Sequence, residues 1–463
     1  MIRLRHTAAA LLALVLVGAP ASAQKPARAS KSTGADAIRI PFEHYTLPNG
    51  LQVVLAESHA TPTVAVDVWY HVGSKNELPG HTGFAHLFEH VMFTGSGNVP
   101  YGVHDKYTEG VGGSNNGSTH NDHTNYFETI PSNYLESALW LESDRMGYLL
   151  DALDTAKLNA QRDIVKNERR QGVDNRPYGR ADEILEAAIY PATHPYSWPV
   201  IGSMADLSAA SEKDVKDFFR TWYAPNDAAL AIAGDFDPAK AKAWVARYFG
   251  GLPRGPAITR PIVPPVTLAA EKRLVEEDRV QIPRLYLRWP TVGEKSADSD
   301  ALELLASILS GPRTARLTKT LVYDRQSAAS VSVFQSPRED VGELSIIITP
   351  RPGHSLRELE LATDSILQRI RSEGPTAAEM QRAKAGAQLS FIAELESNLG
   401  KAEQLLNGLV LHGDAGWFRT DYRRHEAVTA ADVKRVAVQY LGAGRAVLSV
   451  VPTGKKDLAS EAK

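Results

Sequence analysis

Cysteine is absent from the 463 residues of this chain. Its absence excludes disulfides, thiolate metal ligands and a cysteine nucleophile, so the fold must be stabilised by its core alone. It also excludes a lipid anchor of the lipoprotein kind, and no other membrane anchor is expected. If a chain of this size is exported, as the N-terminal residues discussed below indicate, the absence of disulfides is more typical of a bacterial periplasm than of a eukaryotic secretory route.

A strong net charge is also absent. The formal net charge of −3 is typical neither of a nucleic-acid-binding protein nor of a protein drawn to an anionic membrane. No GxxxxGK[ST] loop is present, so phosphate or dinucleotide binding is not indicated. Hydrophobic residues make up 43% of the chain, as in ordinary soluble proteins. The length predicts two domains of about 200 residues each.

The first 23 residues differ from the rest of the chain. MIRLRH is a basic start, TAAALLALVLVG is an apolar run too short to span a membrane, and ASA precedes Gln24. This order is typical of a secretory signal peptide that is cleaved after Ala23, and a buried N-terminal helix is the alternative. We therefore expect an exported protein, located in the periplasm.

Hairpin and helix signals alternate further along the chain. A turn at Asn49-Gly50 leads into a strand, and TVAVDVWYHVG is a second strand. Helices are expected over 81–92, 132–149 and 155–171. Hairpins mixed with long helices predict an α+β fold, in which helices pack on largely antiparallel sheets.

The chain also contains signs of a duplication. Residues 252–266 include five prolines, which predicts an interdomain linker. On either side of it, residues 211–236 and 429–454 each contain a Ser/Thr-x-x-Asp cap, an amphipathic helix, a turn and an apolar strand. Because all four features agree in register, we predict two homologous α/β domains.

Residues 86–90 read HLFEH. On a helix, His86 and His90 project from one face, one turn apart, so that both imidazoles can reach one zinc ion at about 2.0–2.1 Å. Glu89 then lies beside the open side of the metal, where it can take a proton from water. The order His-x-x-Glu-His inverts the His-Glu-x-x-His motif but supplies the same groups. A helix with capped or solvated histidines is the alternative.

Such a site needs a third protein ligand, usually a carboxylate. One face of the helix expected over 155–171 collects these residues: Leu158, Gln161, Ile164, Val165 and Glu168. A glutamate on an apolar face is out of place unless a positive group meets it, so Glu168 is the candidate. The alternative is a surface carboxylate that pairs with Arg162 or Arg169.

Five segments, in order, resemble the pitrilysin or insulinase-like family of zinc peptidases (the inverzincins), which includes the catalytic subunit of the mitochondrial processing peptidase and bacterial two-subunit zinc peptidases. The segments are HLFEH, GGSNNGSTHNDHTNYF (112–127), QRDIVKNERRQ (161–171), HPYSWPVIG (194–202) and YAPNDAALAIAGDF (223–236). The resemblance implies one zinc ion per chain, bound by His86, His90 and Glu168, with Glu89 as the catalytic base.

The resemblance also implies a domain order and an overall arrangement. The two homologous domains are expected to form one half of a clamshell around a chamber. The expected boundaries are a signal peptide (1–23), a flexible leader (24–40), the zinc-bearing peptidase domain (41–250), the proline-rich linker (251–271), a second domain without the zinc motif (272–452) and a charged tail (453–463).

Two features near the motif concern the ligands and the substrate. Gln161 stands where the family often has a second glutamate, two helical turns before Glu168, and is expected to hydrogen-bond near the ligands. The resemblance places Asn116 and Gly117 on an edge strand that holds an extended substrate through its main chain. A polar Gly/Asn loop is the alternative for these two residues.

The resemblance therefore predicts a zinc endopeptidase that cleaves flexible peptides or unfolded segments in an enclosed chamber. A non-catalytic, peptide-binding or scaffold subunit of the same fold is the alternative, although His86, Glu89, His90 and Glu168 are all present. A zinc-binding carrier would leave Glu89 unexplained.

A partner is also expected. In the family, the half opposite the zinc supplies an arginine and a tyrosine that hold the substrate and support the oxyanion. In the corresponding stretch, 315–334, these positions carry Val322 and Ala329. A heterodimer with a paralogue that supplies the Arg/Tyr pair is therefore expected. The alternative is a homodimer in which Tyr323 or Arg325 substitutes for the pair.

Overall fold

The computed structural model describes residues 38–460. The expected signal peptide and nearly all of the expected leader lie outside the described residues, as does the end of the tail. From Arg39 onward the chain forms one compact unit. Within the described part, no helix is both long enough and apolar enough to cross a membrane.

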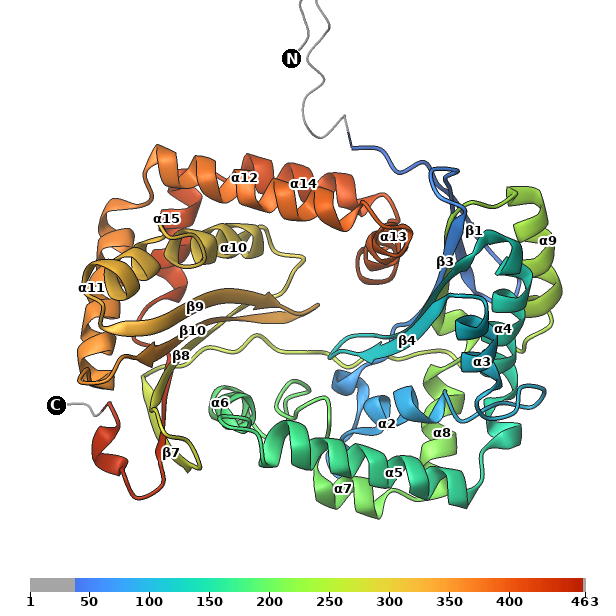
Figure 1. The fold of residues 1–463 in the computed structure, drawn as a ribbon, viewed down its shortest axis with the longest axis horizontal. Helices are drawn as coiled ribbons and strands as arrows, with labels where there is room; N and C mark the ends of the chain where they lie inside the picture. The colour runs from blue at the N-terminus through green and yellow to red at the C-terminus, as the bar shows by residue number, and fades with distance from the viewer. Residues whose placement is uncertain (1–37, 461–463) are drawn as a thin grey trace, which may run out of the picture. The chain divides into compact units, whose positions relative to one another are not determined.

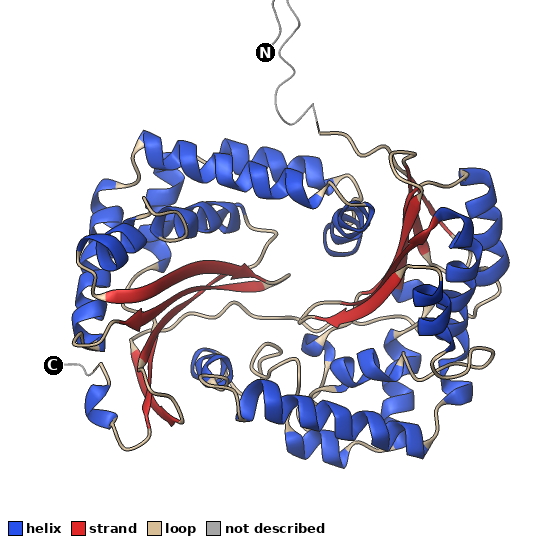
Figure 2. Cartoon of the chain, in the orientation of Figure 1, coloured by secondary structure: helices blue, strands red, loops and turns tan. Residues whose placement is uncertain are grey.

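Two β-sheets flanked by helices make up this unit (Figures 1 and 2). The strands are β1 (Glu43–Thr46), β2 (Gln52–Glu57), β3 (Thr63–Tyr70), β4 (Ser114–Thr119), β5 (Thr124–Pro131), β6 (Ala228–Gly234), β7 (Lys272–Asp278), β8 (Arg284–Val292), β9 (Ala328–Pro337), β10 (Val341–Pro350) and β11 (Ala446–Pro452). The first sheet has the order β1-β2-β6-β3-β5-β4 and the second the order β7-β11-β8-β10-β9.

Most neighbouring strands run antiparallel, and among the strands of residues 38–460 only the pairs β2–β6 and β7–β11 are parallel. The α-helices are α2 (Phe84–Val91), α3 (Val103–Gly110), α4 (Leu135–Ala152), α5 (Thr155–Arg169), α6 (Ala181–Ile189), α7 (Met204–Ala209), α8 (Glu212–Trp222), α9 (Pro238–Phe249), α10 (Ala297–Leu309), α11 (Leu356–Glu373), α12 (Ala377–Glu394), α13 (Asn398–His412), α14 (Trp417–Ala427) and α15 (Ala430–Tyr440). The expected α+β class with largely antiparallel sheets is confirmed.

The two segments that look alike in sequence occupy the same place in the two sheets. Ser211 and Asp214 form a capping box at the start of α8, and Thr429 and Asp432 form one at the start of α15. Each helix leads into a strand, β6 or β11, that lies between one parallel and one antiparallel neighbour. The shared topology is the one expected of duplicated domains.

The two halves also exchange helices. Helix α6, from the first half, packs on β8 and β11 of the second sheet, where Leu185 and Ile189 meet Tyr286 and Leu448. Helix α13, from the second half, packs on β3 and β6 of the first sheet, beside β3 in Figure 1. Because each half covers part of the other half's sheet, the two halves are packed together, and residues of both meet in one shared hydrophobic cluster.

Two glycine backbones meet where α2 begins. Gly83 is the N-cap of α2 with a φ of 90°, and Gly202 has a φ of 71°. A Cβ atom on Gly202 would lie 2.4 Å from both the Gly83 Cα and the Thr82 carbonyl oxygen. The left-handed conformation of Gly83 also explains why α2 starts three residues later than the helix expected from residue 81.

We predict that Gly202→Ala destabilises the protein more than Gly413→Ala. Gly413 has a similar φ of 74°, but a Cβ atom there would meet nothing within 4 Å. Gly413→Ala should therefore cost only the strain of a left-handed residue, ~1–2 kcal/mol. Gly202→Ala adds a backbone clash that must displace the start of α2. Denaturant unfolding followed by tryptophan fluorescence measures both losses, and equal losses would show that the close contact is unimportant.

Candidate metal centre

Helix α2 is held firmly by its apolar face. Its Phe88 packs against Phe218, Phe219 and Tyr223 at the end of α8. At its N-terminus the carboxylate of Glu77, only 4% exposed, accepts hydrogen bonds from two backbone N–H groups. The donors are Gly83 at 2.9 Å and Ala85 at 2.8 Å. These contacts fix the position of the helix that carries the HLFEH motif.

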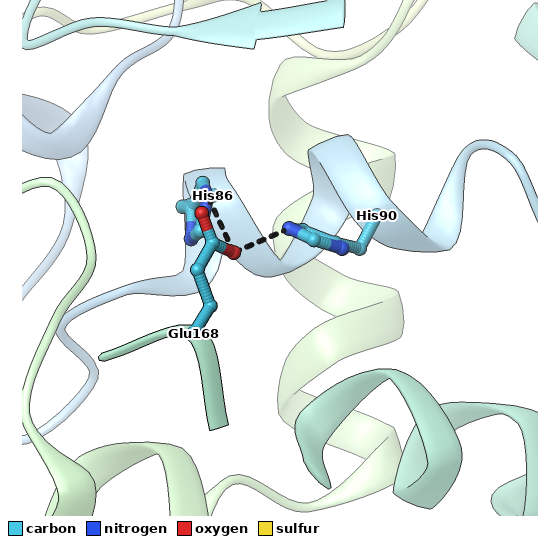
Figure 3. A group of neighbouring side chains, drawn as sticks. All are labelled: His86, His90 and Glu168. Carbon is cyan, nitrogen blue, oxygen red and sulfur yellow. Dashed lines mark ion pairs between the residues drawn. The ribbon is translucent and has the colours of Figure 1, made fainter. Parts of the chain in front are cut away.

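The structure brings together the two histidines of α2 and Glu168 of α5 (Figure 3). The Glu168 Oε2 atom lies 3.2 Å from His90 Nε2 and 3.7 Å from His86 Nε2. Two ligands that each lie 2.0–2.1 Å from a tetrahedral zinc ion are about 3.3 Å apart. The spacing of these atoms therefore suits one zinc ion.

The donor chemistry of the cluster fits zinc as well. Burial, with a smaller effect of the neighbouring His90, lowers the pKa of His86 to about 4. The His86 imidazole is therefore neutral at pH 7 and has a lone pair to donate. Two imidazole nitrogens and one carboxylate oxygen form a ligand set typical of catalytic zinc sites that keep a fourth position open. The side chain of Glu168 is 48% exposed, so one side of the cluster is open to solvent.

The alternative partners of Glu168 are engaged elsewhere. Arg162 donates hydrogen bonds to Asn159, at 2.7 Å, and to the carbonyl of Ala210. Arg169 pairs with Glu183 through both terminal nitrogens. Among the described residues, neither arginine pairs with Glu168. The Glu168 carboxylate faces the two histidines instead.

The prediction of an apolar face on α5 is only partly correct. Leu158 and Val165 are buried, but Ile164 is 49% exposed. The helix therefore packs along a narrower stripe than its sequence suggests. Gln161 is partly buried, and its side chain makes no hydrogen bond to any residue within 38–460. Its expected role beside the ligands stays a prediction.

Glu89, also on α2, is held by strand β4. Its Oε2 atom accepts a hydrogen bond of 2.7 Å from the Thr119 hydroxyl. Burial raises the pKa of Glu89 above its usual value, and the hydrogen bond from Thr119 opposes this shift. A Cβ atom on Gly117 would lie 3.2 Å from Glu89 Cγ, so the glycine lets the strand approach closely.

Thr119 was not among the residues singled out from the sequence. The sequence contains only part of the signal, because Gly117 and Thr119 are two residues apart on one strand and therefore face the same side. Only the pairing of β4 and its approach to α2, which are not visible in the sequence, show that this side faces Glu89.

Strand β4 is the edge of the first sheet and pairs only with β5 among the described strands. Asn116 and Gly117 lie in this strand, opposite Phe127 and Tyr126, so the alternative of a polar loop is wrong. Asn116 is exposed, and its side-chain oxygen accepts the Gly117 N–H at 2.9 Å. An unpaired edge offers main-chain groups to an extended peptide, but the role of these two residues in substrate binding stays a prediction.

The second half carries no comparable constellation at the positions of the Arg/Tyr pair. Val322 packs against the core of the second half, and Ala329 lies exposed on β9. Tyr323 is 43% exposed, and the Arg313 guanidinium lies 4.5 Å from the centre of its ring. The segment Thr318–Asp324 is a π-helix.

Family models match both halves of the chain. Residues 52–197 match the model described as Insulinase (Peptidase family M16), and residues 209–387 match the Peptidase M16 inactive domain. Zinc protease PqqE of Helicobacter pylori is 30% identical over 403 residues, which cover 86% of this chain and 90% of that protein. A probable mitochondrial-processing peptidase subunit beta of Arabidopsis thaliana is 22% identical over 411 residues, covering 86% of this chain and 75% of that protein.

Solved structures share the fold. The crystal structure of a protease from Helicobacter pylori has a TM-score of 0.83 at 27% identity and covers 89% of this chain and 99% of that chain. A putative M16-like peptidase from Alicyclobacillus acidocaldarius has a TM-score of 0.78 at 21% identity, covering 90% of this chain and all of the other. The second likeness concerns the fold alone.

We predict that the purified mature chain binds one zinc ion through His86, His90 and Glu168. His86→Ala and His90→Ala should each lose most of the zinc, because each removes one of three protein ligands. Substitution of a residue that hydrogen-bonds to a metal ligand lowers metal affinity about 10–100-fold. Glu168→Gln alters a ligand itself, so it should weaken zinc binding at least as much. Competition with a chelator measures these affinities. Asp163→Asn, an exposed carboxylate on the same helix, is the control. Wild-type affinity in Glu168→Gln would show that another group is the third ligand.

Proposed function

Because this chain belongs to the insulinase-like M16 peptidase family, we propose that it is a zinc-dependent endopeptidase. The observation that carries the proposal is the convergence of His86, His90 and Glu168, with Glu89 alongside. All four lie in the stretch 52–197 that matches the peptidase model, whereas residues 209–387, which run from the end of the first half into the second, match the inactive-domain model.

His86, His90 and Glu168 would hold the zinc ion. When bound, zinc supplies Lewis-acid chemistry, since it polarises the scissile carbonyl and makes water more acidic. Glu89 takes a proton from the attacking water and later passes it to the leaving amine. The Thr119 hydroxyl, hydrogen-bonded to one Glu89 oxygen, orients this carboxylate and leaves its other oxygen free for the proton.

The proposed substrates are flexible peptides or unfolded segments. A peptide that adds to the open edge of β4 must be extended, and the main chain holds it with little regard for its sequence. Folded proteins cannot present such a segment. The expected enclosed chamber would impose the same limit, because only a flexible chain can enter it.

We also propose that a paralogous subunit completes the site. Val322 and Ala329 supply neither the guanidinium nor the phenol that supports a developing oxyanion. A relative with a similar sequence is by its name a subunit, the mitochondrial-processing peptidase subunit beta. A homodimer in which Tyr323 or Arg325 substitutes for the pair is the alternative. Tyr323 is already stacked under Arg313, which makes it less available.

A subunit that binds peptides without cleaving them remains the second candidate function. The match of residues 209–387 to an inactive-domain model favours it. The presence of Glu89 beside the three candidate ligands argues against a non-catalytic subunit, because such a subunit needs neither a base nor a metal site. As to location, we propose export to the periplasm with cleavage after Ala23, on the basis of the N-terminal sequence.

We predict that Glu89→Gln keeps zinc and fold but lowers peptide cleavage by a factor of at least ~10², the contribution of a general base. Cleavage of a mixed peptide pool, followed by mass spectrometry, measures the loss. Thr119→Val should lower kcat by about 10-fold, as expected for one lost hydrogen bond, and Thr119→Ser should restore it. Undiminished cleavage by Glu89→Gln would mean that another group activates the water. It would leave the metal site itself in place.

We predict that this chain alone cleaves peptides poorly and that a paralogous subunit carrying the Arg/Tyr pair restores activity. One donor missing from an oxyanion site costs about 10²–10³ in kcat, so the gain should be of that order. The assay compares hydrolysis by the chain alone with hydrolysis after the paralogue is added. The same paralogue with its arginine changed to alanine is the control. Full activity in a monodisperse monomer would contradict the shared site.

A further inference from the structure

The second half of the chain reaches the turn that follows β4, the strand that holds Glu89. Strand β4 ends at Thr119 and turns back into β5 through residues 120–123. This turn lies against the segment that follows β3. Ser74 N–H donates to the His120 carbonyl at 3.1 Å, and Lys75 N–H donates to the Asn121 carbonyl at 3.0 Å. The turn next to Thr119 is therefore fixed by backbone contacts.

The contact at this turn is close enough to exclude a side chain. A Cβ atom on Gly73 would lie 2.4 Å from the carbonyl oxygens of both His120 and Asn121. The Asn121 amide also donates to the Ser74 hydroxyl at 2.9 Å. Any shift of the 73–75 segment must therefore move the turn with it.

A hairpin from the second sheet closes on the same turn. Between β9 and β10, the Glu339 N–H donates to Asp122 Oδ2 at 3.0 Å. The Lys75 ammonium lies 2.9 Å from Asp122 Oδ1 and 3.0 Å from Asp340 Oδ2, and it also pairs with Glu339. Lys75 is only 3% exposed, so this ammonium group depends on the three carboxylates.

Two further side chains hold Glu339 in place. Its Oε1 atom pairs with the Lys295 ammonium at 2.7 Å, and its Oε2 atom bonds to His71 Nε2 at 2.9 Å. A buried set of charges of this kind is weak evidence for stability, because packed apolar residues often serve as well. A set that joins residues far apart in the chain does fix their relative position, because a displacement of any one residue would leave a buried charge unpaired.

We infer that the second half is a positioning element for the reaction. Glu339, acting through Lys75 and Asp122, holds the β4–β5 turn so that the Thr119 hydroxyl stays on Glu89. This inference rests on the proposed function, in which Glu89 is the base. Among the described residues, Glu339 and Asp122 contact Lys75 and the β4–β5 turn and not the ligand set or Glu89, so they are positioning residues that act through Thr119.

The test is a double-mutant cycle in the mature chain, with the paralogous subunit added if the wild type requires it. Glu339→Gln keeps the size of the side chain but removes its charge. It should lower kcat at least threefold, change KM less than twofold and leave zinc affinity unchanged. In a Thr119→Val background it should lower kcat no further, because the two residues act on one hydrogen bond. Glu339→Asp should recover part of the loss.

Hydrogen exchange of the backbone amides gives a second readout. Residues 114–123 should exchange faster in Glu339→Gln. If that variant does not fold, Asp122→Asn takes its place and should show the same faster exchange. Glu186→Gln is the matched control, because Glu186 is a buried glutamate that binds Arg338 of the same hairpin at 2.8 Å. It does not contact the turn among the described residues, so neither exchange there nor kcat should change.

Three results would overturn the inference. They are wild-type exchange of residues 114–123 in Glu339→Gln, an equal loss of kcat in Glu186→Gln, and a full further loss of kcat in the Thr119→Val background. If the wild type cleaves no peptide at all, the proposed function fails. The exchange comparison then still decides whether the second half holds the strand.

Discussion

The central constraint in this protein is that a carboxylate on one helix must meet two imidazoles on another helix. Glu168 lies on α5, while His86 and His90 lie on α2, and one oxygen atom faces both rings. Two histidines one turn apart need only a helix, but the third ligand needs two helices held at a fixed distance. The Glu77 carboxylate, the Gly83–Gly202 contact and the packing of Phe88 all serve to hold α2.

Local features of the fold could be predicted from the sequence, because they depend on neighbours in the chain. The Asn49-Gly50 turn, the capping boxes of α8 and α15 and the spacing of the HLFEH motif are of this kind. The resemblance to the insulinase-like family is confirmed by the matched family models, and the expected fold class is confirmed by the two sheets. Glu168 was found because it interrupts an apolar pattern, although Ile164 in that pattern proved to be exposed.

Contacts between distant segments could not be predicted in the same way. The hydrogen bond from Thr119 to Glu89 depends on the approach of β4 to α2, which no local pattern encodes. The N-terminus of α2 is capped by the carboxylate of Glu77, six residues before Gly83, and no pattern in the sequence indicates this contact. The exchange of α6 and α13 between the two halves is likewise a property of the packed chain.

The metal site remains the claim on which the rest of the account depends. Anomalous diffraction at the zinc edge from crystals of the mature protein tests it most directly. The account predicts one zinc peak within about 2.0–2.2 Å of His86 Nε2, His90 Nε2 and a Glu168 oxygen, with a fourth position open to solvent. A peak at other residues, or zinc held without Glu168, would contradict it.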